Sequence, residues 1–201
     1  MLKNLLLALI ALTLGITACQ KDDNSPRPTV AAPAQEATLN LVFRYYSPDE
    51  SRGINYLADK PAGQLLTDRL TVKFTNNFPG LGSTDQIEFV LPKSRQKPGL
   101  VGTYTLASQP DPGQGDVQVS YQRAGTADTH RNGVHSNSNR LEGSFTITSY
   151  DASRNLISGS YTCSAPNSKD PFTFLTNGSS ADSRRDGDLR VSGTFTEVPL
   201  K

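Results

Sequence analysis

Two histidines are the first residues in this sequence whose types and spacing suggest chemistry. His130 and His135 lie in a polar stretch, residues 122–139, and Asp128 precedes them. Both imidazoles and the carboxylate could reach one metal ion, but a zinc site normally needs three or four ligands held in fixed positions. No helix is expected here to hold them. The segment is therefore interpreted as a flexible hairpin loop, and no metal is assigned to it.

Three aspartates form a second candidate ion site. Asp182, Asp186 and Asp188 follow one another closely, with two arginines at 184–185 among them. Oxygen-rich turns can bind Ca²⁺, but a dedicated loop alternates its ligands at fixed positions and ends in a bidentate carboxylate. The arginines oppose cation binding, so a solvated turn is the favoured interpretation, and ion binding stays open as the alternative.

Nucleophiles and paired acids are the remaining catalytic candidates. Cys163 has no histidine nearby in sequence and shares a strand face with Tyr161, so it is expected to be a buried small hydrophobe. Glu50 and Glu88 could act as a glycosidase pair only if the fold placed them ~5–10 Å apart. The sequence has no nucleophile elbow, phosphate loop, dinucleotide fingerprint or Cys-x-x-Cys pair. We therefore expect no enzymatic activity and no cofactor.

Charge and cysteine content narrow the possible partners. The 201 residues include 20 Lys and Arg against 19 Asp and Glu, and only two cysteines, Cys19 and Cys163. The near balance of charge argues against a nucleic-acid partner. If Cys19 is modified, Cys163 has no partner for a disulfide within the chain, and the fold must depend on its hydrophobic core.

The N-terminus has the pattern of an export signal. Residues 1–18 carry a positive charge at Lys3, then an apolar run, then small residues before Cys19. Residues 16–19, Ile-Thr-Ala-Cys, resemble the lipobox of bacterial lipoproteins. That resemblance implies cleavage before Cys19 and acylation of this cysteine, and two or more acyl chains hold a protein stably on a membrane. An ordinary signal peptide with an incidental cysteine is the alternative.

A short acidic segment follows the lipobox. Gln20, Lys21, Asp22 and Asp23 resemble the surface-export signal of Bacteroidetes lipoproteins, and a generic polar tether is the alternative. Residues 24–36 are rich in proline, alanine and polar side chains. We interpret 19–36 as a flexible, semi-extended spacer between the lipid and a folded domain at 37–201.

Alternation of apolar and polar residues dominates the chain after residue 37. This period of two is typical of antiparallel strands with one buried and one solvated face. About nine strands are expected, and segment 55–67, interrupted by Pro61 and Gly63, is expected to form at most a turn of helix. The apolar faces lie at residues 39–45, 70–74, 87–91, around 104, 117–121, 141–147, 157–163, 172–174 and 189–195. The pattern predicts an all-β fold, either an antiparallel sandwich or a partly closed barrel.

A four-residue motif, Gly-[Ser/Thr]-aromatic-Thr, occurs four times. Its copies are residues 102–105, 143–146, 159–162 and 193–196. In a strand the glycine and the aromatic residue point to one face, and the hydroxyl residues point to the other. The motif predicts curved strands with an aromatic core, in which glycine leaves room for a neighbouring ring or permits a β-bulge where the sheet curls. A row of aromatic residues lining a ligand groove is the alternative.

The last two fifths of the chain contain a recognisable hairpin. Residues 140–161, RLEGSFTITSYDASRNLISGSY, place Asp151 and Asn155 at the expected turn between two strands. With the 175–178 Leu-Thr-Asn-Gly segment and the closing 193–195 Gly-Thr-Phe, this region resembles a group of Bacteroidetes lipoproteins that have no established activity. The polar stretch 179–187 departs from the pattern of that group. The resemblance implies a location and a β fold, but no reaction.

Together these features predict a lipid-anchored, non-enzymatic protein of the outer membrane, whose β domain binds a glycan, a small ligand or an envelope protein. Surface exposure is the favoured orientation, with the periplasmic face as the alternative. An accessory subunit of an outer-membrane complex, docking through exposed sheet edges, is the second functional hypothesis.

Overall fold

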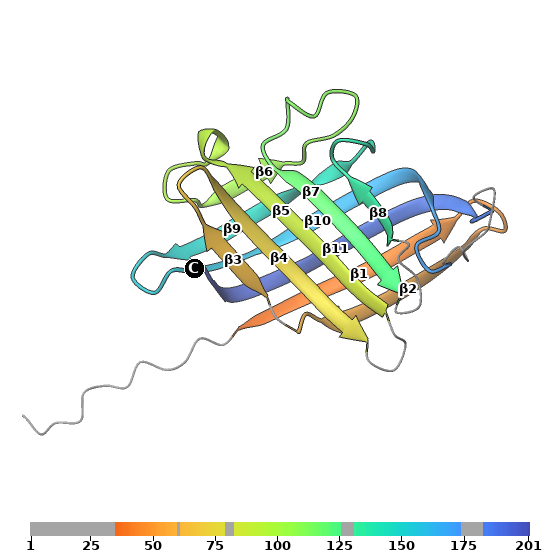
Figure 1. The fold of residues 1–201 in the computed structure, drawn as a ribbon, viewed down its shortest axis with the longest axis horizontal. Coiled ribbons are helices and arrows are strands. Elements are labelled where there is room, and N and C mark those ends of the chain that lie inside the picture. The colour runs from red at the N-terminus through yellow and green to blue at the C-terminus, as the bar shows by residue number, and fades with distance from the viewer. Residues whose placement is uncertain (1–34, 60, 79–82, 126–130, 174–182) are drawn as a thin grey trace, which may run out of the picture. The chain divides into compact units, whose positions relative to one another are not determined.

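The structure is a computed structural model of the chain, and it describes residues 35–59, 61–78, 83–125, 131–173 and 183–201. Eleven strands and one 3₁₀ turn, η1 (Lys93–Arg95), lie in this part of the chain (Figure 1). The strands are β1 (Glu36–Tyr45), β2 (Glu50–Leu57), β3 (Ala62–Leu65), β4 (Arg69–Phe78), β5 (Ser83–Pro92), β6 (Gly102–Thr105), β7 (Gln118–Gly125), β8 (Arg131–His135), β9 (Glu142–Asp151), β10 (Leu156–Lys169) and β11 (Asp186–Pro199).

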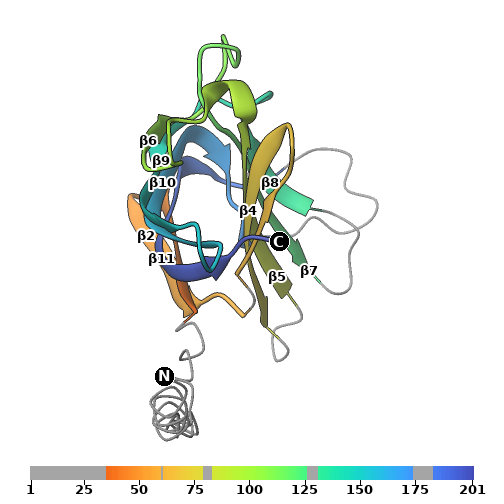
Figure 2. The same cartoon turned by 90° about the vertical axis from the view of Figure 1, so that its left-hand side faces the viewer.

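These strands form two antiparallel sheets. The six-stranded sheet has the order β2-β1-β11-β10-β9-β6, and the five-stranded sheet has the order β3-β4-β5-β7-β8. Figure 2 shows the two sheets as the opposite walls of a β-sandwich. The sequence-based prediction of an all-β antiparallel fold is therefore confirmed, and of its two architectures the sandwich is the correct one. Two isolated parallel bridges, Gly63 to Leu200 and Leu106 to Val117, join the margins of the two sheets.

The core lies between the sheets and is built from the inward side chains of every long strand. Aromatic rings of one sheet contact rings of the other: the ring centroids of Phe74 and Tyr161 lie 5.2 Å apart, and those of Phe89 and Phe145 lie 4.7 Å apart. All four side chains are at most 2% exposed. These buried rings contribute much of the apolar area that stabilises the sandwich.

Two of the four copies of the glycine-aromatic motif are explained by the pairing of β10 with β11. Gly159 lies opposite Phe195, and Tyr161 lies opposite Gly193, so each glycine faces the aromatic residue of the other copy. A Cβ atom on Gly159 would lie 2.6 Å from Cζ of Phe195, and one on Gly193 would lie 2.7 Å from Cζ of Tyr161. Gly159 and Gly193 therefore make room for neighbouring rings, as predicted, and these rings pack in the core instead of lining a groove. A Cβ atom on Gly143 would instead meet the Thr162 backbone, and one on Gly102 would meet the Lys97 side chain.

Three strands were missed by the sequence-based prediction. Segment 55–67 contains the end of β2 and all of β3, so the expectation of at most a helical turn is wrong there. Segment 122–139 contains the end of β7 and all of β8, so the loop expected there is partly strand. These are edge or near-edge strands that bury few side chains, which weakens their hydrophobic alternation.

One expected strand is absent at the position predicted for it. Phe172 lies in a turn after β10, and Phe174 falls outside the described residues. The turn is fixed by Asp170, whose carboxylate accepts hydrogen bonds from Phe172 N at 2.8 Å and from the Thr173 hydroxyl at 2.7 Å. No helix in the described ranges is long and apolar enough to cross a membrane.

Candidate functional site

Several residues singled out from the sequence fall outside the described part of the chain. These are the lipidation site Cys19, the export segment Gln20, Lys21, Asp22 and Asp23, and the candidate ligands Asp128, His130 and Asp182. Across the residues that the structure describes, no group of three or more His, Cys, Asp or Glu side chains could hold a metal ion.

Three members of the two candidate ion sites are described: His135 of the histidine site, and Asp186 and Asp188 of the aspartate site. His135 is the last residue of β8, in the five-stranded sheet, whereas Asp186 and Asp188 belong to β11, in the six-stranded sheet. Asp186 forms a 2.8 Å ion pair with Lys169, and Asp188 accepts a hydrogen bond from the Tyr46 hydroxyl. The two aspartates are thus bound to other side chains of the chain itself.

The candidate nucleophile and the candidate acid pair are not assembled for catalysis. Cys163 is 1% exposed, and burial raises the pKa of its thiol to about 12, which keeps it protonated at neutral pH. Glu50 begins β2 and pairs with Arg185, whereas Glu88 lies in β5 of the other sheet. The prediction for Cys163 as a buried small side chain is confirmed.

A buried ion pair lies at the end of the core formed by β5 and β7. Arg123 pairs with Asp85, and the Tyr121 hydroxyl donates to the other carboxylate oxygen at 2.7 Å. Burial raises the pKa of the Asp85 carboxyl, against the opposing effect of the Arg123 guanidinium. The Phe172 ring lies 4.3 Å from the Arg52 guanidinium carbon and 5.2 Å from that of Arg123. This network joins β5 and β7 at the end of the sandwich, and the Asp85 carboxylate is bound on both of its oxygens.

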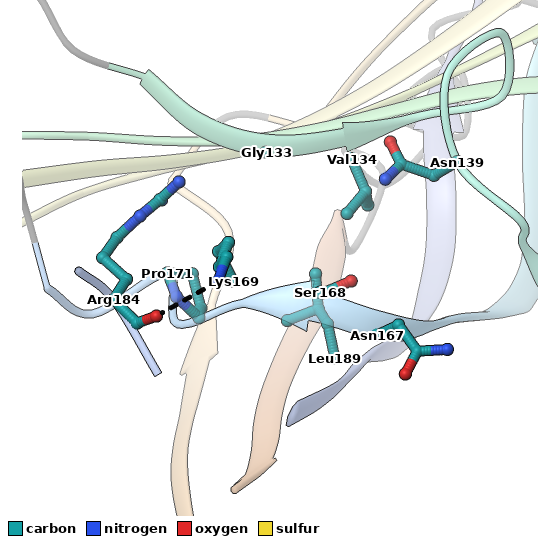
Figure 3. A pocket seen from close by; sticks show the side chains of 9 residues that line it. All are labelled: Gly133, Val134, Asn139, Asn167, Ser168, Lys169, Pro171, Arg184 and Leu189. Atoms are coloured by element: carbon teal, nitrogen blue, oxygen red, sulfur yellow. Dashed lines mark hydrogen bonds between the residues drawn. The ribbon is translucent and has the colours of Figure 1, made fainter. Parts of the chain in front are cut away.

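Three hollows in the described residues could admit a ligand, and two of them are small. Figure 3 shows the first, of about 170 Å³, between β8 and the end of β10. Its two cations are held by the chain's own groups: Arg184 donates to Oδ1 of Asn132, and Lys169 pairs with Asp186. This arrangement leaves little reason to assign an anion to the first hollow.

The second hollow, of about 180 Å³, lies on the outer face of the five-stranded sheet. The strand register places Lys73, Glu88, Ser120 and His135 side by side in one row across β4, β5, β7 and β8. Nucleophilic catalysis needs the histidine between the acid and the serine, so that the acid orients the base. Here Ser120 lies between Glu88 and His135, so the row has the wrong order for a catalytic triad.

The third hollow is a groove of about 420 Å³, within the ~300–1,000 Å³ range of small-molecule sites. We call it the 93–100 groove. It is lined by Leu65, Lys93, Gln96, Lys97, Pro98, Gly99, Leu100 and Tyr150. Most of these residues come from η1 and the loop between β5 and β6, while Leu65 comes from β3 and Tyr150 from β9. Elements of both sheets therefore contribute to its walls.

The loop that forms this groove is held in place by a buried tyrosine. The Tyr104 hydroxyl donates to Leu100 O at 2.7 Å and accepts from Lys97 N at 3.2 Å. Gly99 and Leu100 have φ angles of 67° and 63°, the left-handed region that leucine rarely occupies. Such a backbone persists only where surrounding contacts enforce it, and it occurs often at ligand-binding sites.

The side chains of the groove combine apolar surface from Leu65, Leu100 and Tyr150 with positive charge from Lys93 and Lys97. Gln96 donates from Nε2 to Leu91 O at 3.3 Å, while its Oε1 is buried without a hydrogen-bond partner in the described structure. This oxygen is closed to solvent, so a ligand in the groove could not reach it without movement of the side chains around it. The size of the 93–100 groove and its mixed apolar and basic walls make it the candidate functional site.

The 93–100 groove was not predicted from the sequence. Its signal was available in residues 93–97, Lys-Ser-Arg-Gln-Lys, which hold three cations and no acid directly before a Pro-Gly turn. Leu65 and Tyr150 are distant in sequence and could be joined to this segment only by the fold. No protein-family model, curated protein or solved structure matches the chain.

Proposed function

We propose that this protein is a lipid-anchored extracytoplasmic binding module, without catalytic activity, that holds a small ligand in the 93–100 groove. The observation that carries the proposal is the groove itself. It is larger than the other two hollows, it is bounded by a loop that Tyr104 holds in place, and its walls combine apolar side chains with two lysines. A rigid site of this kind binds without a large ordering cost.

The anchor is supported by the N-terminal sequence, in which Cys19 follows an apolar export signal and a lipobox-like tripeptide. Its test is protease digestion of tagged protein on intact cells, comparing the native chain with Cys19→Ala. Digestion of the native protein on intact cells places the domain outside. Digestion only after lysis places it in the periplasm. If Cys19→Ala stays on the membrane as the native chain does, the anchor at Cys19 is contradicted.

The surface location depends on the acidic residues after the cysteine. Replacing Asp22 and Asp23 with alanine is expected to move the protein from the outer surface to the inner leaflet, while acylation of Cys19 continues. Surface labelling that is equal in the variant and the native chain would remove this part of the proposal. Acyl labelling of both chains is the control.

Binding without turnover is tested with the full chain carrying Cys19→Ala, which has no acyl chains of its own that could occupy the groove. The small-molecule fraction of the producing cells is added, and backbone amide shifts are recorded. Selective shifts at residues 93–101, with the bound compound recovered unchanged, support the proposal. Shifts only elsewhere, or a chemically altered compound, contradict it.

A further inference from the structure

We propose, building on the lipid anchor proposed above, that the end of the sandwich around the 93–100 groove rests on the anionic surface of a lipid bilayer. The partner of this end is the membrane itself. Its headgroups attract the basic side chains of the groove region, and its interface receives the apolar side chains that flank the groove. The groove then opens toward the bilayer.

The chain joins the domain at this same end. β1 begins at Glu36, opposite Thr196 of β11, and five residues further along β11 Lys201 O accepts a hydrogen bond from Leu65 N at 3.1 Å. Leu65 is a wall of the groove. Five extended residues span at most ~17 Å, so the groove lies near the point where the chain continues toward Cys19. Figure 1 shows the start of β1, the C-terminus and the short coil of η1 on the same side of the domain.

The length of chain between the anchor and the domain favours this contact. From Cys19 to Glu36 the chain can reach at most ~60 Å, even when fully extended. A tether of that reach holds the domain beside the bilayer at an effective concentration on the order of millimolar. Even a weak attraction between the domain and the lipid surface is therefore enough to populate the contact.

Positive charge predominates around the groove. No Asp or Glu occurs between Glu88 and Asp111, and this stretch holds three exposed cations, Lys93, Arg95 and Lys97. Other acids at this end are offset by arginines of the same end. These pairs are Asp68 with Arg69, and Asp151 and Glu197 with Arg154. The groove region therefore has an excess of positive charge, which an anionic lipid surface attracts.

Cations and carboxylates are interleaved at the opposite end of the sandwich, where β1 ends and β2 and β11 begin. The ion pairs there are Arg44 with Asp49, Arg185 with Glu50, and Lys169 with Asp186. Asp188 adds a further carboxylate, which accepts a hydrogen bond from the Tyr46 hydroxyl. An anionic surface is thus attracted to the groove end in preference to the opposite end, and this asymmetry orients the domain.

Apolar side chains lie beside the basic ones at the groove end. Leu66 and Val101 are 39% and 46% exposed, and they directly follow two residues of the groove wall, Leu65 and Leu100. At a bilayer interface, apolar side chains enter the headgroup region while the charged ends of lysine and arginine stay at its surface. A small dissolved anion would satisfy the charge of this region but would leave these apolar side chains in water.

Tryptophan reporters test the contact, because the chain has no tryptophan of its own. Val101→Trp marks the groove end, and Tyr46→Trp, at a position 47% exposed directly after β1, marks the opposite end. A histidine tag in place of residues 1–19 holds the chain on vesicles that contain nickel-chelating lipid, so the test does not depend on acylation. Quenching by brominated lipid is measured on phosphatidylcholine vesicles, with and without an equal amount of phosphatidylglycerol.

We expect Val101→Trp to be quenched on the phosphatidylglycerol vesicles, and Tyr46→Trp to be quenched much less. Each lysine near an anionic surface strengthens binding about fivefold, so Lys93→Gln with Lys97→Gln should lower the ratio of docked to free domains about 25-fold. Lys73→Gln with Arg190→Gln, on the outer faces of the two sheets, is the matched control and should leave the quenching unchanged. In about 1 M salt the Debye length falls to about 3 Å, and the quenching at position 101 should fall without any further substitution.

The outcomes separate the membrane contact from the proposed function. Equal quenching of the two tryptophans, or stronger quenching at position 46, overturns the proposed orientation. Quenching at position 101 that is equal with and without phosphatidylglycerol overturns the anionic surface as the partner. Acyl labelling of Cys19 and shifts of residues 93–101 by the cellular small-molecule fraction would leave the proposed function standing in either case. Quenching at position 101 without acyl labelling of the native chain would instead refute the anchor and support the contact.

Discussion

Replacing Gly193 with alanine tests the explanation given for the glycine-aromatic motif. Gly193 in β11 lies under the Tyr161 ring, whose hydroxyl reaches across it to donate to Thr38 O in β1 at 3.0 Å. A Cβ atom at this position would lie 2.0 Å from Thr38 O and 2.7 Å from both Cζ and the hydroxyl oxygen of Tyr161. The nearest of these contacts is to backbone, so the central strands of the sheet would have to move.

The expected cost follows from these contacts. Overpacking a well-packed core costs about 1–3 kcal/mol, and loss of the tyrosine hydrogen bond adds about 0.5–1.5 kcal/mol. We therefore expect Gly193→Ala to lower the free energy of unfolding by about 3 kcal/mol. In a domain of this size, that lowers Tm by about 6–12 °C.

Urea and thermal unfolding of the full chain carrying Cys19→Ala measure this effect. Circular dichroism and tyrosine fluorescence are suitable, because the chain has no tryptophan. Gly113→Ala is the matched control, since its Cβ atom would meet nothing closer than Oδ1 of Asp111 at 3.4 Å, an ordinary contact. It should change stability by less than about 0.5 kcal/mol. A Tm for Gly193→Ala equal to that of Gly113→Ala would refute the packing role of the motif.

Three further predictions concern buried and charged groups. Asp85→Asn leaves the buried Arg123 without the carboxylate that it contacts, and should cost about 3 kcal/mol in urea unfolding; an unchanged midpoint would contradict the structural role of the pair. Cys163 should not react with iodoacetamide at pH 8 in the folded protein, because burial raises its pKa to about 12, but should react in urea; rapid labelling without urea would disprove its burial. The pKa of Asp151 is lowered, mainly by the hydrogen bond that its carboxylate accepts from the Ser153 hydroxyl. The ionised carboxylate therefore stabilises the fold above the ordinary carboxyl pKa of about 3.9, and this stabilisation is lost as pH falls below that value. The Tm of the native protein should therefore fall more than that of Asp151→Asn between pH 5 and pH 2. Equal falls of Tm in the two proteins would show that ionisation of Asp151 does not stabilise the fold.

The class of fold could be predicted because alternation is a local property of each strand. In β1, Leu39, Leu41 and Phe43 are completely buried, as their spacing predicts. The hairpin turn could also be predicted, since the Asp151 carboxylate accepts hydrogen bonds from the backbone N–H of Ser153 at 2.9 Å and of Arg154 at 3.1 Å.

Strands that bury little could not be recognised in this way. β3 has four residues and follows Pro61, and its pairing with the rest of the fold includes a bridge from Gly63 to Leu200, far away in sequence. Gly63 of β3 allows this close approach, because a Cβ atom at that position would lie only 2.4 Å from the Leu200 side chain. The partner that makes this segment a strand is therefore absent from its local sequence.

The sequence by itself determined the all-β class, and it predicted both the export signal and the room that Gly159 and Gly193 leave for neighbouring rings. These depend on residue type and on spacings of a few residues, which act locally. Only the tertiary structure brought Leu65 and Tyr150 to the Lys93–Lys97 segment and left Gln96 Oε1 without a donor. A groove depends on which distant segments become neighbours, and that is decided by the packing of the two sheets rather than by any one stretch of chain.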